Sequence, residues 1–283
     1  MKIIEKESIA QNLTKFVVNA PLIARKTLPG QFIVLMVREE GERIPLTVVD
    51  ADKKRGCITI IFQEVGYTTK LMGRLNEGDS LYSLVGPLGK PTPIKNYGKV
   101  ILLGGGVGIA ELLPVANALK AAGCNVTSIL GGRTAELVIL KDQVKRYSDE
   151  FYITTDDGSL GEKGIVTDIL NRLLKKSHDY GLVFCVGPVS MMKAVADATR
   201  QAKIKTIVCL NPIMIDGTGM CGGCRVTVAG EMKFACVDGP DFNGHEVDFN
   251  ELISRQKRFV QYEKHSMCKL DAQIKDMKAE GGR

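Results

Sequence analysis

The sequence predicts a β-barrel joined to an α/β domain, followed by a small cysteine-rich segment. Three observations support this order. Short β-like runs separated by turns fill residues 1–97, which is typical of a small antiparallel barrel. Apolar strands alternate with helical patterns over residues 98–211, as in a doubly wound parallel sheet. Residues 212–250 lose this periodicity and hold three closely spaced cysteines, and residues 251–283 resemble a helical tail of mixed charge that would dock a partner.

The bulk composition is that of a globular protein of two or three domains. The 283 residues are 45% hydrophobic and 25% charged, and their net charge is +6. This mild charge shows no concentrated basic stripe, so no nucleic-acid partner is indicated. Residues 1–6 are already charged, and the apolar stretch 100–119 is interrupted by glycines, a proline and Glu111. We therefore expect neither a secretory signal nor a membrane span. Eight mostly isolated cysteines suggest a reducing compartment, and hence a cytoplasmic protein.

Candidate strands in the barrel region are separated by glycine-containing turns. They cover residues 14–19, 31–38, 46–50, 57–64 and 80–85, with a short helix expected at 71–75. Arg43 and Thr47 place a fixed cation and a hydroxyl beside the start of a strand. A diphosphate would suit Arg43, and an exposed ion pair is the alternative.

From residue 99 the pattern indicates a series of βαβ units. The run 100–103 is continuously apolar, as in a strand buried on both faces. We then expect helices at 109–122, 136–147, 166–175 and 189–201, and strands at 125–130, 151–154, 182–186 and 206–210. A ligand crevice should lie at the carboxyl ends of the parallel strands.

A glycine-rich turn joins the first of these strands to its helix. Its residues are Gly104, Gly105, Gly106, Val107 and Gly108. Backbone N–H groups at such a turn can meet a phosphate, although Ile109 takes the place of the third glycine in G-x-G-x-x-G. The strand–turn–helix context favours dinucleotide phosphate binding over a plain turn.

Two later turns of the same region are further candidates for nucleotide binding. Arg133 could meet a 2′-phosphate or be merely solvated, so the choice between NADH and NADPH stays open. Gly187 and Pro188 make a rigid turn that a nicotinamide could approach, and a plain connection is the alternative.

The cysteine-rich segment carries a metal-ligand pattern. Asp216, Cys221, Cys224 and Cys236 read D-x₄-C-x₂-C-x₁₁-C, with Asp216 at the first cysteine of a plant-type [2Fe–2S] loop. Asp216 as a turn residue is the alternative. A redox dithiol is a further alternative, as is a zinc site. Zinc would take its fourth ligand from Cys209, His245 or Cys268.

In this order the motifs resemble the ferredoxin–NADP reductase superfamily. They are R-x-P-L-T at 43–47, V-G-x-x-T at 65–69, G-P-L-G at 86–89, the turn 104–108 and the cysteine segment. The chain resembles the electron-transfer subunit of dihydroorotate dehydrogenase B. It resembles still more the small subunit of the NADH-dependent reduced ferredoxin:NADP oxidoreductase (Nfn), because Asp216 replaces a cysteine. Val186 stands where the superfamily often has cysteine, which weakens a case for a catalytic thiol there.

The resemblance implies FAD in the barrel, NAD(H) at the glycine-rich turn and a [2Fe–2S] cluster on the cysteine segment. The residues that would contact FAD are Arg43, Pro45, Leu46, Thr47, Ile61, Phe62, Gln63, Gly66, Thr68 and Thr69. It also implies a larger iron–sulfur flavoprotein partner, through which ferredoxin is reached.

These cofactors predict an electron relay. A flavin can exchange a hydride with NADH and pass single electrons to the cluster, so no acid–base side chain is required. The dihydroorotate-type subunit is one alternative, and a zinc-stapled flavoprotein redox sensor without turnover is another. The direction of electron flow and the oligomeric state are not predicted.

Overall fold

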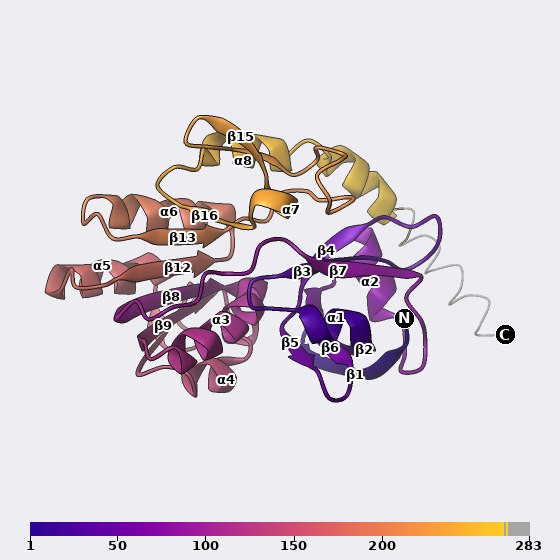
Figure 1. The fold of residues 1–283 in the computed structure, drawn as a ribbon, viewed down its shortest axis with the longest axis horizontal. Coiled ribbons are helices and arrows are strands. Elements are labelled where there is room, and N and C mark those ends of the chain that lie inside the picture. The colour runs from indigo at the N-terminus through magenta and orange to yellow at the C-terminus, as the bar shows by residue number, and fades with distance from the viewer. Residues whose placement is uncertain (269, 271–283) are drawn as a thin grey trace.

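The computed structural model describes residues 1–268 and residue 270 (Figure 1). Two small antiparallel sheets form the N-terminal part, and a seven-stranded sheet follows. The predicted antiparallel barrel and doubly wound parallel sheet are both confirmed. Within the described residues, no helix combines the length and apolar character needed to cross a membrane.

The barrel pairs a four-stranded sheet with a three-stranded one. Its strands are β1 (Ile3–Ala10), β2 (Leu13–Asn19), β6 (Cys57–Gln63) and β5 (Asp50–Asp52) in one sheet, and β4 (Ile44–Thr47), β3 (Phe32–Met36) and β7 (Ser83–Leu88) in the other. Phe16 and Phe62 meet edge to face in the core, with ring centroids 5.0 Å apart. Two helices, α1 (Pro21–Lys26) and α2 (Tyr67–Gly73), complete the barrel region.

The barrel differs from the sequence prediction at its edges. Strand β1 was not among the candidates, and the strand expected at 46–50 divides into β4 and β5, which belong to different sheets. The strand expected at 80–85 begins only at Ser83, because Ser80 makes just an isolated bridge to Lys2. Runs this short carry too few alternating residues to fix their own ends.

The large sheet has the strand order β11-β10-β9-β8-β12-β13-β16. Its strands are β8 (Lys99–Gly105), β9 (Asn125–Gly132), β10 (Glu150–Thr155), β11 (Glu162–Lys163), β12 (Leu182–Val186), β13 (Thr206–Cys209) and β16 (Asp241–Asn243). All pairs are parallel except β13–β16. The run 100–103 is fully buried, as its unbroken apolar character predicts.

Helices cover both faces of this sheet. Residues of α3 (Ile109–Ala121) and α4 (Lys141–Lys145) share one core cluster, and those of α5 (Val166–Lys176) and α6 (Val189–Arg200) share another. The helix expected at 136–147 is wrong in extent. A 3₁₀ turn, η2 (Ala135–Leu137), precedes it, and Leu140 at φ 53° interrupts the helical path.

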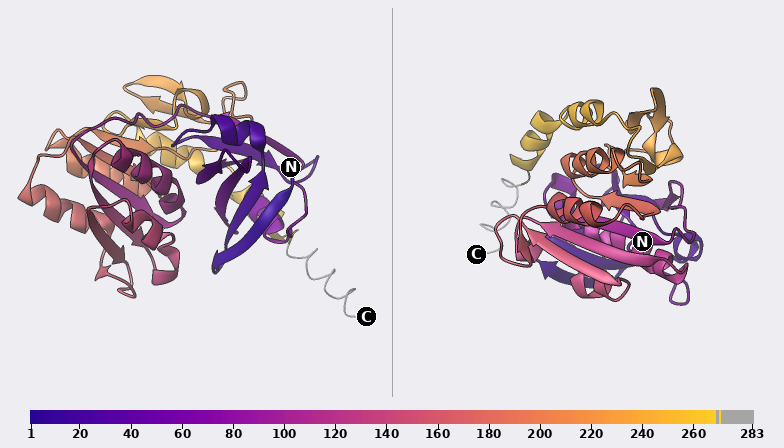
Figure 2. Two further views of the ribbon diagram at one scale, coloured as in Figure 1. Left: turned by 60° about the horizontal axis from the view of Figure 1, so that its bottom comes forward. Right: turned by 90° about the vertical axis from the view of Figure 1, so that its left-hand side faces the viewer.

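The C-terminal segment packs onto the α5–α6 face. It contains the hairpin β14 (Arg225–Val228) and β15 (Glu231–Phe234), then α7 (Ala235–Asp238) and α8 (Phe249–Gln256). Its buried residues join the same core as α6. Figure 2 shows this segment, orange to yellow, running along one side of both the sheet and the barrel. A Cβ on Gly217 would lie 2.5 Å from Leu88 of the barrel, so the loop before the hairpin also touches the barrel closely. The docking role expected for 251–283 falls partly on 269 and 271–283, outside the described residues.

Candidate functional site

A cavity of about 710 Å³ opens at the carboxyl ends of the parallel strands. Its walls come from the ends of β8, β9, β10 and β12 on one side, and from β4 and β6 of the barrel on the other. The position agrees with the rule that open α/β sheets bind ligands where the strand order reverses, here between β8 and β12. The predicted crevice is thus confirmed, and the barrel closes it.

The cavity brings together residues that the sequence assigned to two different cofactors. Those assigned to the nucleotide are Gly105, Gly106, Val107, Gly108, Arg133, Gly187 and Pro188; those assigned to FAD are Leu46, Thr47, Ile61 and Gln63. Gly104 stays inside the sheet, where its Cβ position faces Ile109 and Leu112. Residues of the barrel and residues of the sheet therefore line one cavity.

The cavity wall is shaped for a close-fitting polar ligand. A Cβ on Gly105 would lie 2.6 Å from the Met191 sulfur, and one on Gly108 would lie 2.8 Å from the Val186 carbonyl oxygen. The Thr154 hydroxyl is buried in the same wall without a hydrogen-bond partner. Because buried hydroxyls are rarely left unsatisfied, this one indicates a ligand with polar groups. The residues present therefore fit a nucleotide cofactor.

The remaining FAD candidates lie on the barrel outside this cavity. They are Arg43, Pro45, Phe62, Gly66, Thr68 and Thr69. Arg43 is exposed before β4 and forms no ion pair within the described part of the chain. Thr69 accepts the Gly66 N–H at 3.0 Å, and Thr68 donates to Glu42 Oε2 at 2.6 Å. Phe62 is in the barrel core, so its backbone alone is open to a ligand.

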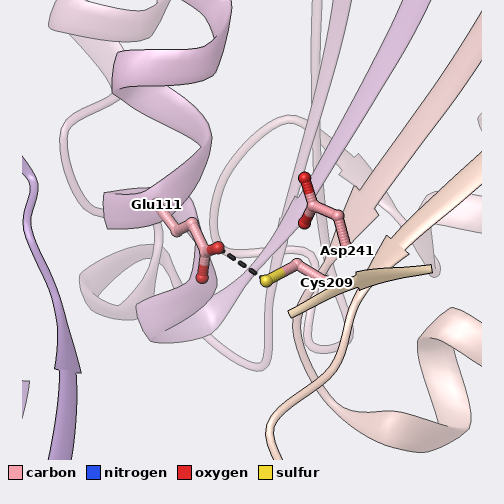
Figure 3. A group of neighbouring side chains, drawn as sticks. All are labelled: Glu111, Cys209 and Asp241. Carbon is pink, nitrogen blue, oxygen red and sulfur yellow. Dashed lines mark hydrogen bonds between the residues drawn. The ribbon is translucent and has the colours of Figure 1, made fainter. Parts of the chain in front are cut away.

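Sequence reasoning did not bring together three titratable side chains, two of which line the cavity while the third lies behind its wall. Figure 3 shows Glu111 of α3, Cys209 of β13 and Asp241 of β16, whose ligand atoms all lie within 4.8 Å of one another. The Cys209 thiol donates to Glu111 Oε1 at 2.6 Å. Thr47 donates to Glu111 Oε2 at 3.1 Å, and Thr92 donates to Asp241 Oδ2 at 2.6 Å. The available signal was a glutamate inside an apolar helix, where ionised side chains are seldom buried.

Burial controls the protonation of this group. It raises the pKa of Glu111, which is 9% exposed, against the hydrogen bonds from Cys209 and Thr47. Burial and the nearby Glu111 raise the pKa of Asp241 to about 7. Burial, Glu111 and Asp241 together raise the pKa of the Cys209 thiol. Burial therefore favours the protonated form of each of the three side chains.

The four predicted cluster ligands lie in two pairs. Cys224 and Cys236 are buried with their sulfurs 3.2 Å apart. Asp216 accepts backbone N–H groups from Thr218 at 2.9 Å and from Cys221 at 2.7 Å. These bonds hold the pKa of Asp216 below its usual range, so it is a carboxylate. Cys221 is exposed beside it.

A two-iron cluster needs two ligand pairs, whereas a zinc ion needs all its ligands around one point. Among the described residues, the acidic group of Figure 3 is the one set of three that meets within 4.8 Å. The residues suggested as a fourth zinc ligand lie elsewhere. Cys209 bonds Glu111, the His245 ring contacts Thr199 at 2.9 Å, and Cys268 is exposed near the C-terminus. The paired arrangement fits the cluster.

Comparisons with known proteins agree with this site. Residues 211–248 match the iron–sulfur cluster binding domain of dihydroorotate dehydrogenase B. A Thermotoga maritima homologue of the electron transfer subunit of dihydroorotate dehydrogenase B (NAD⁺) is 47% identical over 94% of this chain and 93% of its own length. The Geobacillus thermodenitrificans electron transfer subunit is 32% identical over 87% of this chain and 97% of its own.

Solved structures show the same likeness. A chain from the NADH-dependent reduced ferredoxin–NADP oxidoreductase structure, reported for insights into flavin-based electron bifurcation, is 46% identical with a TM-score of 0.89. The match covers 95% of this chain and 96% of that one. Phthalate dioxygenase reductase, at 20% identity and a TM-score of 0.58 over 80% and 85% of the two chains, shares the fold.

The barrel and the doubly wound sheet have the ferredoxin reductase fold, and an iron–sulfur binding domain follows them. The chain belongs to the family of dihydroorotate dehydrogenase B electron transfer subunits and their homologues.

Proposed function

We propose that the chain is an electron-transfer flavoprotein subunit that relays electrons between NAD(H), FAD and a [2Fe–2S] cluster. The observation that carries this proposal is the shared cavity, in which the nucleotide turn of the sheet faces the barrel strands β4 and β6. The likeness to the NADH-dependent ferredoxin–NADP oxidoreductase, an electron-bifurcating complex, supports it. The same likeness favours a heterodimer with a larger iron–sulfur flavoprotein, with ferredoxin reached through that partner.

The residues divide the work of the relay. Gly105 and Gly108 would let backbone N–H groups approach the nucleotide phosphates, and the turn of Gly187 and Pro188 would hold the nicotinamide. Leu46, Thr47 and Gln63 would hold the flavin ring from the barrel. Flavin supplies the conversion between hydride and single-electron transfer when it is bound. We assign FAD to residues 1–97, the nucleotide to 98–211 and the cluster to 212–250.

In our assignment, Asp216 and Cys221 hold one iron, and Cys224 and Cys236 hold the other. The close approach within each pair supports this division. The buried pair faces the core shared with α6, and the Asp216 loop touches the barrel at Leu88. The cluster would therefore be close to the flavin-bearing part of the chain. We also propose a cytoplasmic location, in keeping with the eight free cysteines.

Dihydroorotate oxidation by a partner is the second candidate. The family model and several relatives carry that name, which favours it. Asp216 favours the first candidate, because the resemblance implies that the dihydroorotate-type subunits have a cysteine at this position.

Cofactor analysis of protein purified without oxygen, together with any co-purifying subunit, tests the proposal. We expect about one FAD and about two iron atoms with inorganic sulfide per chain. Zinc without iron would contradict the relay and support a zinc-stapled sensor. Reduction of the complex by dihydroorotate, with FMN in the partner, would establish the second candidate instead.

A further inference from the structure

A chain of five side chains leads from the cavity to the linker before β8. Thr47, Glu111 and Cys209 line the cavity, and Asp241 and Thr92 continue behind them. Cys209 and Asp241 face each other directly in the antiparallel pair β13–β16, which fixes their approach. Asp241 Oδ1 is buried without a hydrogen-bond partner. These side chains connect the cavity wall to β16, the strand that follows the last cluster cysteine, Cys236.

Among the described residues, no positively charged side chain acts on the pKa values of these three groups. The groups that act on the pKa values of Glu111, Cys209 and Asp241 are one another and the hydroxyls of Thr47 and Thr92. Like charges this close in a buried site cannot all ionise. The three groups therefore titrate as a unit and share the protons they retain.

The hydrogen bonds favour stored protons over a metal ion. Cys209 donates a hydrogen bond to Glu111 and is therefore a thiol. Only a thiolate is an effective metal ligand, and burial raises the pKa of this thiol further. The hydroxyls of Thr47 and Thr92 already bond the two carboxyl groups.

We propose that Glu111, Cys209 and Asp241 store a proton that Glu111 delivers through Thr47 to the flavin when electrons arrive from the cluster. The inference rests on the proposed function. It departs from the sequence-based expectation that no acid–base side chain takes part.

The stored proton would supply what a flavin lacks when it is reduced by single electrons. A hydride from NADH carries its own hydrogen, whereas electrons from the cluster carry none. Reduction by two cluster electrons therefore needs one proton at the flavin nitrogen N5. Thr47 donates to Glu111 Oε2 in this structure, so delivery requires this hydroxyl to turn. The O–H bond of a protonated Glu111 would then break, and the Thr47 hydroxyl would accept that proton and give its own to a bound flavin.

The position of Glu111 suits it to losing a proton. It lies in the first turn of α3, where the helix dipole stabilises a carboxylate. The Cys209 thiol bond stabilises the same charge. Asp241, the next acid in the chain, can restore the proton through Cys209.

The test compares two routes of flavin reduction in the holoprotein. Dithionite supplies electrons without hydrogen, and NADH supplies a hydride. For Glu111→Gln we expect reduction by dithionite to slow at least about tenfold, and reduction by NADH to change less than about threefold. The control is Glu136→Gln, an exposed glutamate in the 3₁₀ turn η2, for which both rates should stay as in the native protein.

Infrared difference spectra between oxidised and reduced protein give a readout independent of rate. The carbonyl band of a protonated carboxylic acid should change on reduction in the native protein and in Glu136→Gln, and be absent in Glu111→Gln. Equal slowing of both routes, no such band, or a zinc ion lost in Cys209→Ser would overturn the proposal.

Two further outcomes remain decisive. If Glu111→Gln does not retain flavin, native protein in D₂O decides: slower reduction by dithionite than in H₂O supports the store, and equal rates contradict it. If the native protein binds no flavin, the proposed function itself fails. A flavin that is reduced normally without the carboxylic band refutes the proton store alone.

Discussion

The parallel sheet and the cluster loop reach their shapes by different means. Residues 100–103 of β8 and all of β12 are buried, and helices cover them on both faces. Residues 215–224 form bends without regular secondary structure, with Gly219 and Gly222 at positive φ. The sheet is held by burial of its own side chains, which needs no cofactor. The loop buries little and presents ligands, so its order should depend on the cluster.

The largest effect that distinguishes the two regions is expected from cysteine substitution. Cys224→Ser removes a buried ligand of the loop, and we expect iron content to fall close to zero. Cys185→Ser changes a buried cysteine of β12 and should leave iron content unchanged, at a stability cost of about 1–3 kcal/mol. Iron and sulfide analysis measures both. Full iron in Cys224→Ser would remove this residue from the ligand set.

Shortening a core side chain should affect the free energy of unfolding more in the sheet than in the loop. Leu102→Ala leaves a cavity in β8 and should lower the free energy of unfolding by about 2–5 kcal/mol. Met220→Ala, in the loop at 90% exposure, should change it by less than about 0.5 kcal/mol. Denaturant titration followed by circular dichroism compares them. Similar losses in the two variants would mean that the loop is as tightly packed as the sheet.

The sheet region should also show its own pH dependence. The pKa of Asp241 is raised to about 7, from an unfolded value of about 3.9. A raised acid pKa gives stability that is complete below about pH 4 and is lost as the pH rises to about 7. Relative to Asp241→Asn, the native protein should lose about 2–4 kcal/mol over this range. Parallel stability curves for the two proteins would contradict the buried-acid assignment.

The finest effect concerns one ligand atom of the loop. Asp216→Cys should keep the cluster but shift its midpoint potential, because sulfur replaces oxygen at one iron. Asp179→Asn, remote on the surface, serves as the control and should leave the potential unchanged. A redox titration followed by absorption measures the shift. An unchanged potential in Asp216→Cys would reduce Asp216 to a turn residue.

The sequence predicted those parts that local pattern determines. β12 has the predicted ends, residues 182–186, because turns on both sides of an unbroken apolar run fix where the strand begins and ends. The ligand spacing at 216–236 pointed to the same domain that the family model matches. Local pattern also placed the glycine turn at the cavity.

The acidic group could not be predicted because its members are far apart in the chain. Glu111 and Cys209 are separated by 98 positions, and Asp241 joins them through β16, a three-residue strand. A strand so short has no detectable periodicity, and its antiparallel pairing breaks the βαβ pattern. The shortened α4 has a similar origin, since the left-handed Leu140 has no signature in the sequence.

The most direct test of the relay is an absorption spectrum of anaerobically purified protein before and after NADH is added. The account predicts flavin bands with a long-wavelength iron–sulfur shoulder, and bleaching of both by NADH, because the flavin passes single electrons to the cluster. A flavin that bleaches while the shoulder persists would contradict the transfer from flavin to cluster. A flavin spectrum without the shoulder would leave a simple flavin reductase.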